Sequence, residues 1–153
     1  MEVRLATLDD VGNFCHLFTE FFAYNAALQP EYCNAIIEDG KYPEAVIKDE
    51  NSDIFIAIEN DLIVGFIHVI ESKTLPYASI VQHNYAEVMA FMVTASCRRK
   101  NVGSKLMSAV KEWGTTRNLD YIELVTLSNA KEAHAFYDRY GFETKAHVMR
   151  CAL

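Results

Sequence analysis

Positive charge, cysteine pairs and long apolar runs are all scarce in this sequence, and each scarcity excludes a class of protein. Lys and Arg total 14 against 21 Asp and Glu, so the net charge of −7 disfavours general nucleic-acid binding. No run approaches the roughly 20 apolar residues of a membrane span, and Met1–Arg4 does not begin a signal peptide. The cysteines form no C-x-x-C pair, which predicts reduced thiols in a cytoplasmic protein.

Several motifs that carry chemistry are also missing. The sequence lacks G-x-x-x-x-G-K-[ST] and G-x-G-x-x-G, so a nucleotide P-loop and a dinucleotide site are disfavoured. It lacks G-x-S-x-G, which disfavours a serine hydrolase. Five histidines and four cysteines are scattered without metal-ligand spacing, and we expect no metal. No repeat, linker or low-complexity segment appears, which favours one domain over residues 1–153.

What the sequence does contain is a strand, a short basic loop and a helix in succession. Residues 87–93 are mostly apolar without Gly or Pro, as in a buried strand, and Val102, Leu106, Val110 and Trp113 then follow at helical spacing. The loop between them points unpaired backbone N–H groups and the positive end of the helix dipole at one spot. Such a place suits an anion, and phosphate suits it best. The basic side chains around it are Arg98, Arg99, Lys100 and Lys105.

The same run resembles the acyl-CoA signature Q/R-x-x-G-x-G/A of the GCN5-related N-acetyltransferase (GNAT) superfamily. Arg98 stands at the first position and Gly103 at the last, whereas Asn101 replaces the usual Gly at the fourth. Among the residues other than glycine, Asn best tolerates a left-handed backbone, so we expect the turn to persist. A second segment, residues 129–142, resembles the family's asparagine followed by A-x-x-F-Y-x-x-x-G-F.

The resemblance implies a mixed α/β fold, with a mostly antiparallel sheet of about six or seven strands and about four flanking helices. Periodicity and turn residues place strands near residues 2–6, 54–58, 62–70, 87–93, 121–127 and 142–150, and helices near 11–21, 31–37, 44–48, 102–113 and 129–140. Thr7 and Asp10 suggest a capping box, Asn60-Asp61 a hairpin turn, and Gly65 a bulge or a close backbone approach.

The resemblance also implies acetyl-CoA as cosubstrate and a defined set of residues around it. The backbone of Phe91, Met92 and Val93 is expected to bind the pantetheine arm, and Asn129 to touch it or to cap the next helix. Phe136 and Tyr137 complete the set on the following helix. The pyrophosphate is expected at the signature loop, which consists of Arg98, Arg99, Lys100, Asn101, Val102, Gly103, Ser104 and Lys105.

Two side chains are the candidates for proton transfer. Tyr137 matches the family's usual general acid toward the thiolate, since a phenol stays protonated at neutral pH. Glu87 is the candidate base that deprotonates the acceptor amine, directly or through water. His83 and His134 are alternative bases, although His134 could instead pair with Asp138 one turn later.

The acceptor is expected to be a small-molecule amine such as a polyamine, an amino sugar or an amino-acid-like compound. Tyr24 and Tyr32 are candidates for its pocket, with ordinary packing as the alternative for each. Two other functions fit the sequence: a non-catalytic acyl-CoA sensor, which the Asn101 departure leaves open, and an acetyltransferase of protein Lys or N-terminal amines. A homodimer is expected from the resemblance alone.

Overall fold

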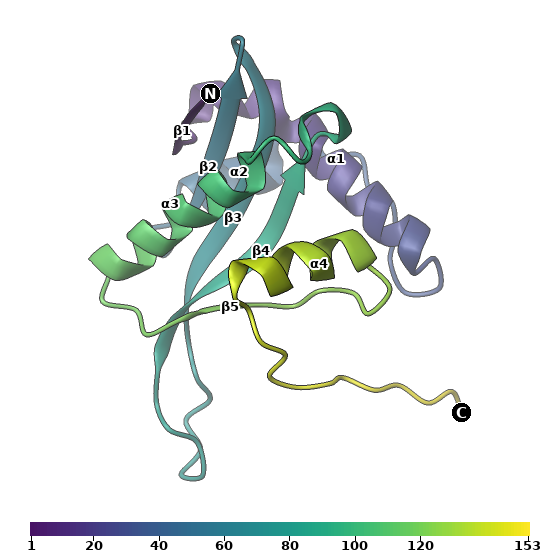
Figure 1. Ribbon diagram of the computed structural model, residues 1–153, viewed down its shortest axis with the longest axis vertical. Coiled ribbons are helices and arrows are strands. Elements are labelled where there is room, and N and C mark those ends of the chain that lie inside the picture. The colour runs from purple at the N-terminus through teal and green to yellow at the C-terminus, as the bar shows by residue number, and fades with distance from the viewer.

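A computed structural model describes residues 1–153 and is organised around one five-stranded sheet (Figure 1). The strands follow one another across the sheet in chain order, antiparallel up to the fourth, while the fifth runs parallel to the fourth. The predicted mixed α/β class is confirmed, with five strands instead of about six or seven. The strands are β1 (Glu2–Leu5), β2 (Ser52–Glu59), β3 (Leu62–Lys73), β4 (Asn84–Val93) and β5 (Ile122–Leu124).

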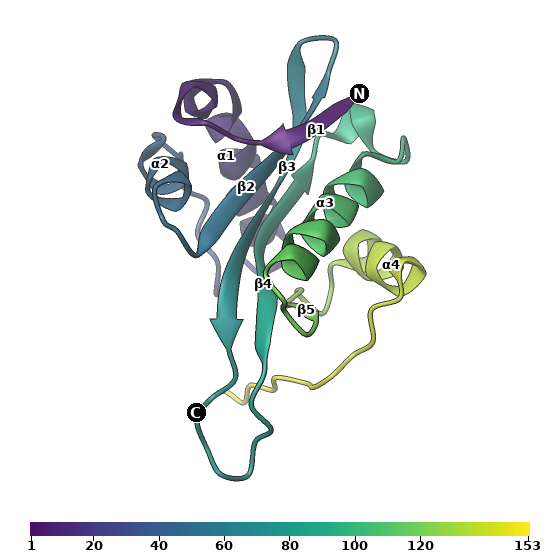
Figure 2. The same ribbon diagram turned by 90° about the vertical axis from the view of Figure 1, so that its left-hand side faces the viewer.

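The helices cover the two faces of this sheet in pairs, as Figure 2 shows. The sheet therefore has a core on each side, because alternate residues of a strand point to opposite faces. One core joins Ile56 and Phe66 to Phe14 and Phe18 of the first helix, and the other joins Ile67 and Val88 to the third helix. The helices are α1 (Val11–Leu28) and α2 (Lys41–Ile47) on one face, and α3 (Val102–Thr116) and α4 (Lys131–Tyr140) on the other.

Both features predicted around the β2–β3 hairpin are confirmed. Asn60 and Asp61 have φ values of 51° and 62°, so this two-residue turn uses the left-handed conformations that suit the twist of a hairpin. A Cβ on Gly65 would lie 2.9 Å from the carbonyl oxygen of Met92. Glycine therefore lets β3 approach the part of β4 that faces the candidate site.

The predicted capping box at the start of the first helical segment is also present. The Asp10 carboxylate accepts hydrogen bonds from the Thr7 backbone N–H and hydroxyl, each at 2.8 Å. Arg4 donates two more bonds to it from β1, also at 2.8 Å. The Arg4 bonds hold the pKa of Asp10 well below its usual range, despite the opposing effect of burial. This buried carboxylate thus fixes α1 to the edge of the sheet.

We expect Asp10→Asn to lower the free energy of unfolding by about 2 kcal/mol at pH 7, because charge-assisted bonds to a buried group are lost. The folded-state pKa lies below the unfolded one, so the contribution is present above about pH 4 and disappears as the pH falls further. Urea denaturation at pH 7 and pH 3 measures both effects, with the exposed Asp9→Asn as control. An equal loss at both pH values would contradict this account.

The predicted helix over residues 31–37 is wrong. The segment is irregular, and Ile36 and Ile37 are 52% and 88% exposed. Seven residues form too short a helix to persist without a buried apolar face. The nearby Glu38 carboxylate instead accepts bonds from the N–H groups of Gly40 and Tyr42 and so caps α2.

The predicted final strand over residues 142–150 is also wrong. After Phe142, which packs beside Tyr137 of α4, the chain makes no backbone hydrogen bond. It leaves α4 as an extended segment that does not run beside β5 (Figure 1). With β5 reduced to Ile122–Leu124 from the predicted 121–127, little strand edge is available to pair with it.

Candidate active site

The site begins where two parallel neighbours in the sheet separate. β4 and β5 pair only over Ala86–Val88 and Ile122–Leu124. The β3–β4 register then shifts so that Met89 has no partner on β3, and such a bulge bends its strand. A cavity of about 890 Å³ opens between the continuation of β4 and residues 125–127 after β5.

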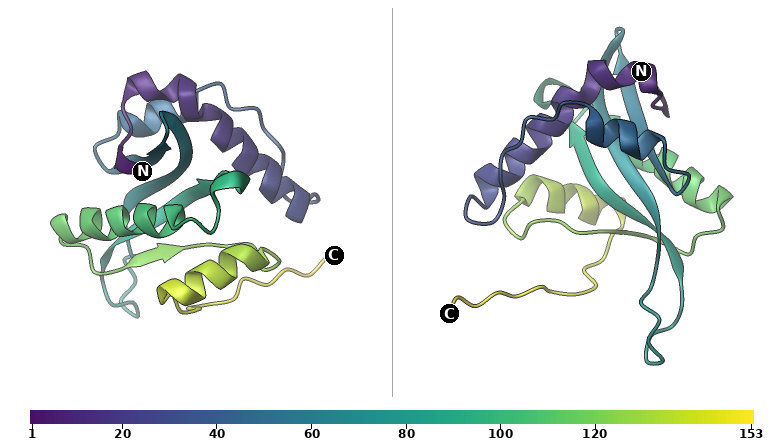
Figure 3. Two further views of the ribbon diagram at one scale, coloured as in Figure 1. Left: turned by 45° about the horizontal axis from the view of Figure 1, so that its top comes forward. Right: turned by 180° about the vertical axis from the view of Figure 1, so that it is seen from behind.

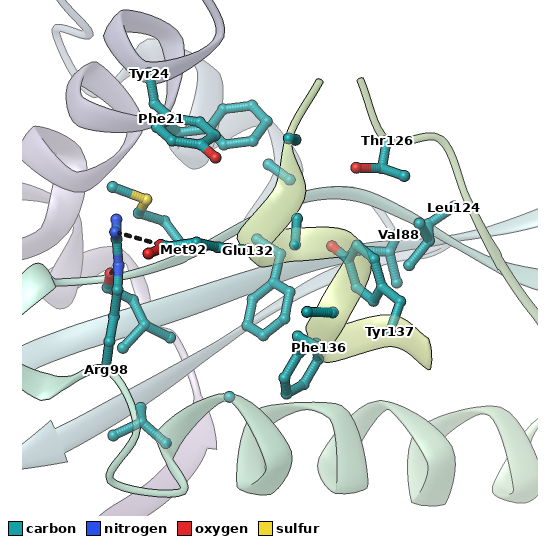
Figure 4. Close-up of a pocket in the computed structure, with 18 of the residues that line it drawn as sticks. Phe21, Tyr24, Val88, Met92, Arg98, Leu124, Thr126, Glu132, Phe136 and Tyr137 are labelled. Carbon is teal, nitrogen blue, oxygen red and sulfur yellow. Dashed lines mark hydrogen bonds and ion pairs between the residues drawn. The ribbon is translucent and has the colours of Figure 1, made fainter. Parts of the chain in front are cut away.

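Helices on both sides of the sheet close this cavity. Phe21 and Tyr24 of α1 line one side, and Phe136 and Tyr137 of α4 line the other (Figure 4). Because α1 and α4 lie on opposite faces of the sheet, the cavity passes between the strands from one face to the other. Two reactants could therefore enter it from opposite faces.

The loop that connects β4 to α3 presents a run of free amides at one end of the cavity. The backbone N–H groups of residues 99–104 donate to no protein acceptor, and the first bond of the helix runs from Lys105 N–H to the Asn101 carbonyl. Arg99 and Asn101 adopt left-handed conformations, with φ of 61° and 65°. The prediction that Asn101 keeps this turn is confirmed. Consecutive free amides at a helix N-terminus suit a phosphate or pyrophosphate group.

Arg98 fixes this loop to the elements on either side of it. Its Nε donates to the Val93 carbonyl at 3.2 Å, and its Nη1 lies 3.2 Å from a Glu132 carboxylate oxygen in the first turn of α4 (Figure 4). Arg99 also lines the cavity, whereas Lys100 and Lys105 are exposed and lie outside the lining. The backbone, more than the basic side chains, therefore provides the surface that suits an anion.

Gly103 lies where the helix passes closest to the cavity wall. A Cβ at this position would meet the rings of Phe136 and Phe91, each at 3.2 Å. The two rings also contact each other, with centroids 5.5 Å apart. The missing side chain thus lets the first turn of α3 pack on the aromatic wall formed by β4 and α4.

Tyr137 places a protonated hydroxyl group in this cavity. Burial raises the pKa of Tyr137 to about 12, and the neighbouring Tyr24 adds to the rise. Its ring packs among Phe91, Phe136 and Phe142. The phenol therefore stays protonated at neutral pH and can donate a hydrogen bond to an atom that gains negative charge.

Comparison with protein families places most of the chain in a known group. The profile described as "Acetyltransferase (GNAT) family" matches residues 13–142, a span that includes the loop, Gly103 and Tyr137. The chain belongs to this family. It is an N-acetyltransferase, and the predicted resemblance is confirmed.

The proteins to which this chain is similar are distant in sequence, and the solved structures among them are close in fold. An uncharacterised N-acetyltransferase of Bacillus subtilis, YhdJ, is 28% identical over 108 residues, which cover 70% of this chain and 72% of the relative. The aminoalkylphosphonate N-acetyltransferase of Salmonella typhimurium is 26% identical over 142 residues, 93% of this chain and 84% of that protein. A mutant of the BH1408 protein of Bacillus halodurans superposes with a TM-score of 0.93 at 18% identity, over 100% of this chain and 99% of the other.

Solved GNAT structures also include an aminoglycoside N-acetyltransferase, AAC(6')-Iy, in complex with CoA. It superposes with a TM-score of 0.75 at 17% identity, over 99% of this chain and 98% of the other. At this identity the likeness concerns the fold alone.

Besides Lys100 and Lys105, two predicted residues of the site, Glu87 and Asn129, lie outside the cavity lining. Glu87 lies one residue before the point where β4 and β5 separate, and its carboxylate accepts a bond from the Ser72 hydroxyl at 2.7 Å. The Asn129 amide donates to the Leu28 carbonyl at the end of α1. Its predicted role as a helix cap is wrong, because α4 begins at Lys131 with Ala130 at the N-cap.

The remaining polar candidates also have structural partners elsewhere. His134 Nε2 donates to the Leu127 carbonyl at 2.9 Å, so its predicted pairing with Asp138 is not formed. His83 pairs with Asp120 at 2.9 Å near the start of β4. Tyr24 lines the cavity, whereas Tyr32 is exposed and stacks against the Arg150 guanidinium.

Some lining residues could not be found from sequence motifs. Phe21 reads as part of the apolar stripe of α1, and Met89 reads as an ordinary strand residue, because a bulge has no signal in a single sequence. Side chains of β4 alternate between the two faces of the sheet, but the direction of the Met89 side chain follows only when the register with β3 is known.

No helix of the chain is sufficiently long and apolar to cross a membrane. His, Cys, Asp and Glu side chains form no group of three or more that could hold a metal ion.

Proposed function

We propose that this GNAT protein transfers the acetyl group of acetyl-CoA to the primary amine of a small acceptor, such as a polyamine, an amino sugar or an amino-acid-like compound. The observation that carries the proposal is the run of free amides at residues 99–104, at one end of a cavity that contains the Tyr137 hydroxyl. The relative named for aminoalkylphosphonate acetylation supports a small amine as acceptor.

The residues around the cavity fit the parts of acetyl-CoA. The free amides at residues 99–104 and Arg99 suit the pyrophosphate. Phe91, Met92 and Val93 lie on β4 after β5 has diverged, so this edge has no neighbouring strand and can bond an amide-bearing arm. When bound, acetyl-CoA supplies the acetyl group as a reactive thioester.

Tyr137 then acts on the leaving sulfur mainly as a hydrogen-bond donor. Full proton transfer from a phenol with a pKa of about 12 to a thiolate, whose acid has a pKa near 8.5, is uphill by about 5 kcal/mol. A donated hydrogen bond needs no such transfer, and it strengthens as negative charge develops on the sulfur.

Glu87 is the candidate that removes a proton from the acceptor. An alkyl ammonium with a pKa near 10.4 has no free lone pair and must be deprotonated before it attacks. The side chain of Glu87 points away from the α3 core, because its neighbour Val88 belongs to that core. Since Glu87 does not line the cavity, we assign it the role of a base that acts through water.

We expect Glu87→Gln to lower kcat by about 100-fold at pH 7, since general-base assistance contributes roughly this much. The loss should shrink as the pH rises toward the pKa of the amine, because more acceptor is then already deprotonated. The pH profile of kcat measures this, with the exposed Glu112→Gln of α3 as a matched control. A loss that is the same at every pH would remove Glu87 from the role of base.

The activity itself is tested by release of free thiol from acetyl-CoA in the presence of single amines from each acceptor class. We expect release with at least one small amine and little release with a lysine peptide. Release with the lysine peptide alone would favour the acetyltransferase of protein amines. Binding of acetyl-CoA without release in any mixture would favour the non-catalytic sensor.

A further inference from the structure

The face of the sheet that carries α1 and α2 has a polar cluster close to the point where β4 and β5 separate. Val88 and Leu124, the last pair of these strands, pack in or against the α3 core. The preceding pair, Glu87 and Glu123, therefore points to the opposite face. The cavity lining starts at Val88 and Leu124, so these two carboxylates are the last paired side chains on this face before the cavity.

Two aromatic rings extend the cluster along the same face. Tyr85 and Tyr121 are stacked, with centroids 5.1 Å apart and an interplanar angle of 12°. Burial and then the charges of Glu87 and Glu123 raise the pKa of Tyr85, which reflects how close these groups lie. Carboxylates beside aromatic rings are the chemistry by which proteins bind alkyl ammonium groups.

The two carboxylates differ in how they are held. Glu87 accepts the hydroxyl of Ser72, a neighbouring side chain on β3. Glu123 is only 26% exposed, and Lys145 is the sole side chain that bonds to it. Glu123 is therefore a partly buried carboxylate with a single side-chain partner, the Lys145 ammonium.

The cation, the Lys145 ammonium, belongs to the C-terminal segment of the chain. Residues 143–153 make no backbone hydrogen bond. Lys145 reaches Glu123, and Arg150 further along stacks on Tyr32 in the connection between α1 and α2. The segment thus leaves α4 and lies as an extended strap (Figure 3). The Lys145 side chain is 66% exposed, so another ammonium group could displace it without unfolding any element.

We propose that Glu123, with the stacked Tyr85 and Tyr121, binds a second ammonium group of the acceptor, and that Lys145 occupies this subsite in the free protein. The inference rests on the proposed transfer to an amine and adds the class of acceptor, a linear diamine or longer polyamine. One ammonium group loses its proton near Glu87 and is acetylated. The other replaces Lys145 on Glu123 and stays charged throughout.

Binding tests the subsite independently of turnover. The CoA-loaded protein is titrated calorimetrically with diaminobutane, diaminopentane and diaminohexane, and with butylamine, pentylamine and hexylamine as matched monoamines. We expect at least one diamine to bind about 10-fold more tightly than the monoamine of equal length. Glu123→Gln should remove this difference, whereas Glu123→Asp should keep part of it.

Lys145→Gln should have the opposite effect from Glu123→Gln, because it removes the internal competitor. We expect it to tighten diamine binding several-fold and to leave monoamine binding unchanged. The control is Glu112→Gln, an exposed carboxylate on α3, for which all six affinities should match those of the unmodified protein.

The outcomes separate this inference from the proposed function. Equal affinities for diamines and monoamines, or an equal effect of Glu123→Gln on both, would overturn the subsite. Free thiol release is read in the same mixtures. Selective diamine binding without thiol release would uphold the subsite and contradict the transferase activity. Thiol release that is equal for diamines and monoamines would uphold the transferase activity and contradict the subsite.

Discussion

Replacing Tyr137 with Phe should lower kcat by about 100-fold and leave the affinity for acetyl-CoA nearly unchanged. The substitution removes one hydroxyl and keeps the ring that packs against Phe91, Phe136 and Phe142. Loss of a preorganised donor to a developing negative charge typically has an effect of this size. Steady-state kinetics, together with calorimetric binding of CoA, separate the two quantities.

The matched control is Tyr140→Phe, one turn later on α4. The Tyr140 hydroxyl interacts with Ser108 at 3.2 Å and does not line the cavity, so its loss should leave kcat within about 2-fold, as for an ordinary surface change. If Tyr137→Phe turned over as fast as the unmodified enzyme, another donor would have to stabilise the leaving sulfur.

Gly103→Val should weaken CoA binding by about 10- to 100-fold, because overpacking at this site displaces either the helix or the aromatic wall. The added side chain would start from a Cβ already 3.2 Å from the Phe136 and Phe91 rings. Movement of the first turn of α3 would misalign the free amides of residues 99–104. Calorimetric titration with CoA measures the loss.

Two other glycine variants show whether position or bulk is responsible. Gly103→Ala adds only the Cβ, which the rings can accommodate by a small shift, so its loss should be several-fold smaller. Gly12→Val, in α1, places its Cβ in open space and should leave CoA binding unchanged. Normal CoA binding by a folded Gly103→Val protein would mean that the cosubstrate lies elsewhere.

Local patterns were sufficient to predict the elements that carry the GNAT site. The apolar run of β4, the helical spacing from Val102 to Trp113 and the tolerance of Asn101 for a left-handed backbone are all properties of neighbouring residues. Each depends on rules that act within a few residues. The loop conformation could therefore be predicted even where Asn replaces the usual Gly.

Features that depend on distant partners could not be predicted. Glu31–Ile37 has helix-compatible residues but no surface that buries Ile36 and Ile37, and residues 142–150 have strand-like composition but no free strand beside them. The raised pKa of Tyr137 depends on burial beside Tyr24, which comes from a helix more than a hundred residues earlier in the chain. Such effects follow from tertiary packing, which a single sequence does not specify.

We propose that acetyl-CoA binds in the cavity between β4 and β5, with its pyrophosphate at the free amides of residues 99–104. The most direct test is a thermal-shift titration with acetyl-CoA, CoA and ATP in parallel. A ligand at about 100 times its Kd should add roughly 2.7 kcal/mol of stability. We predict a raised Tm with acetyl-CoA and with CoA and no rise with ATP. A folded sample that responds to none of the three would mean that this cavity does not bind acetyl-CoA.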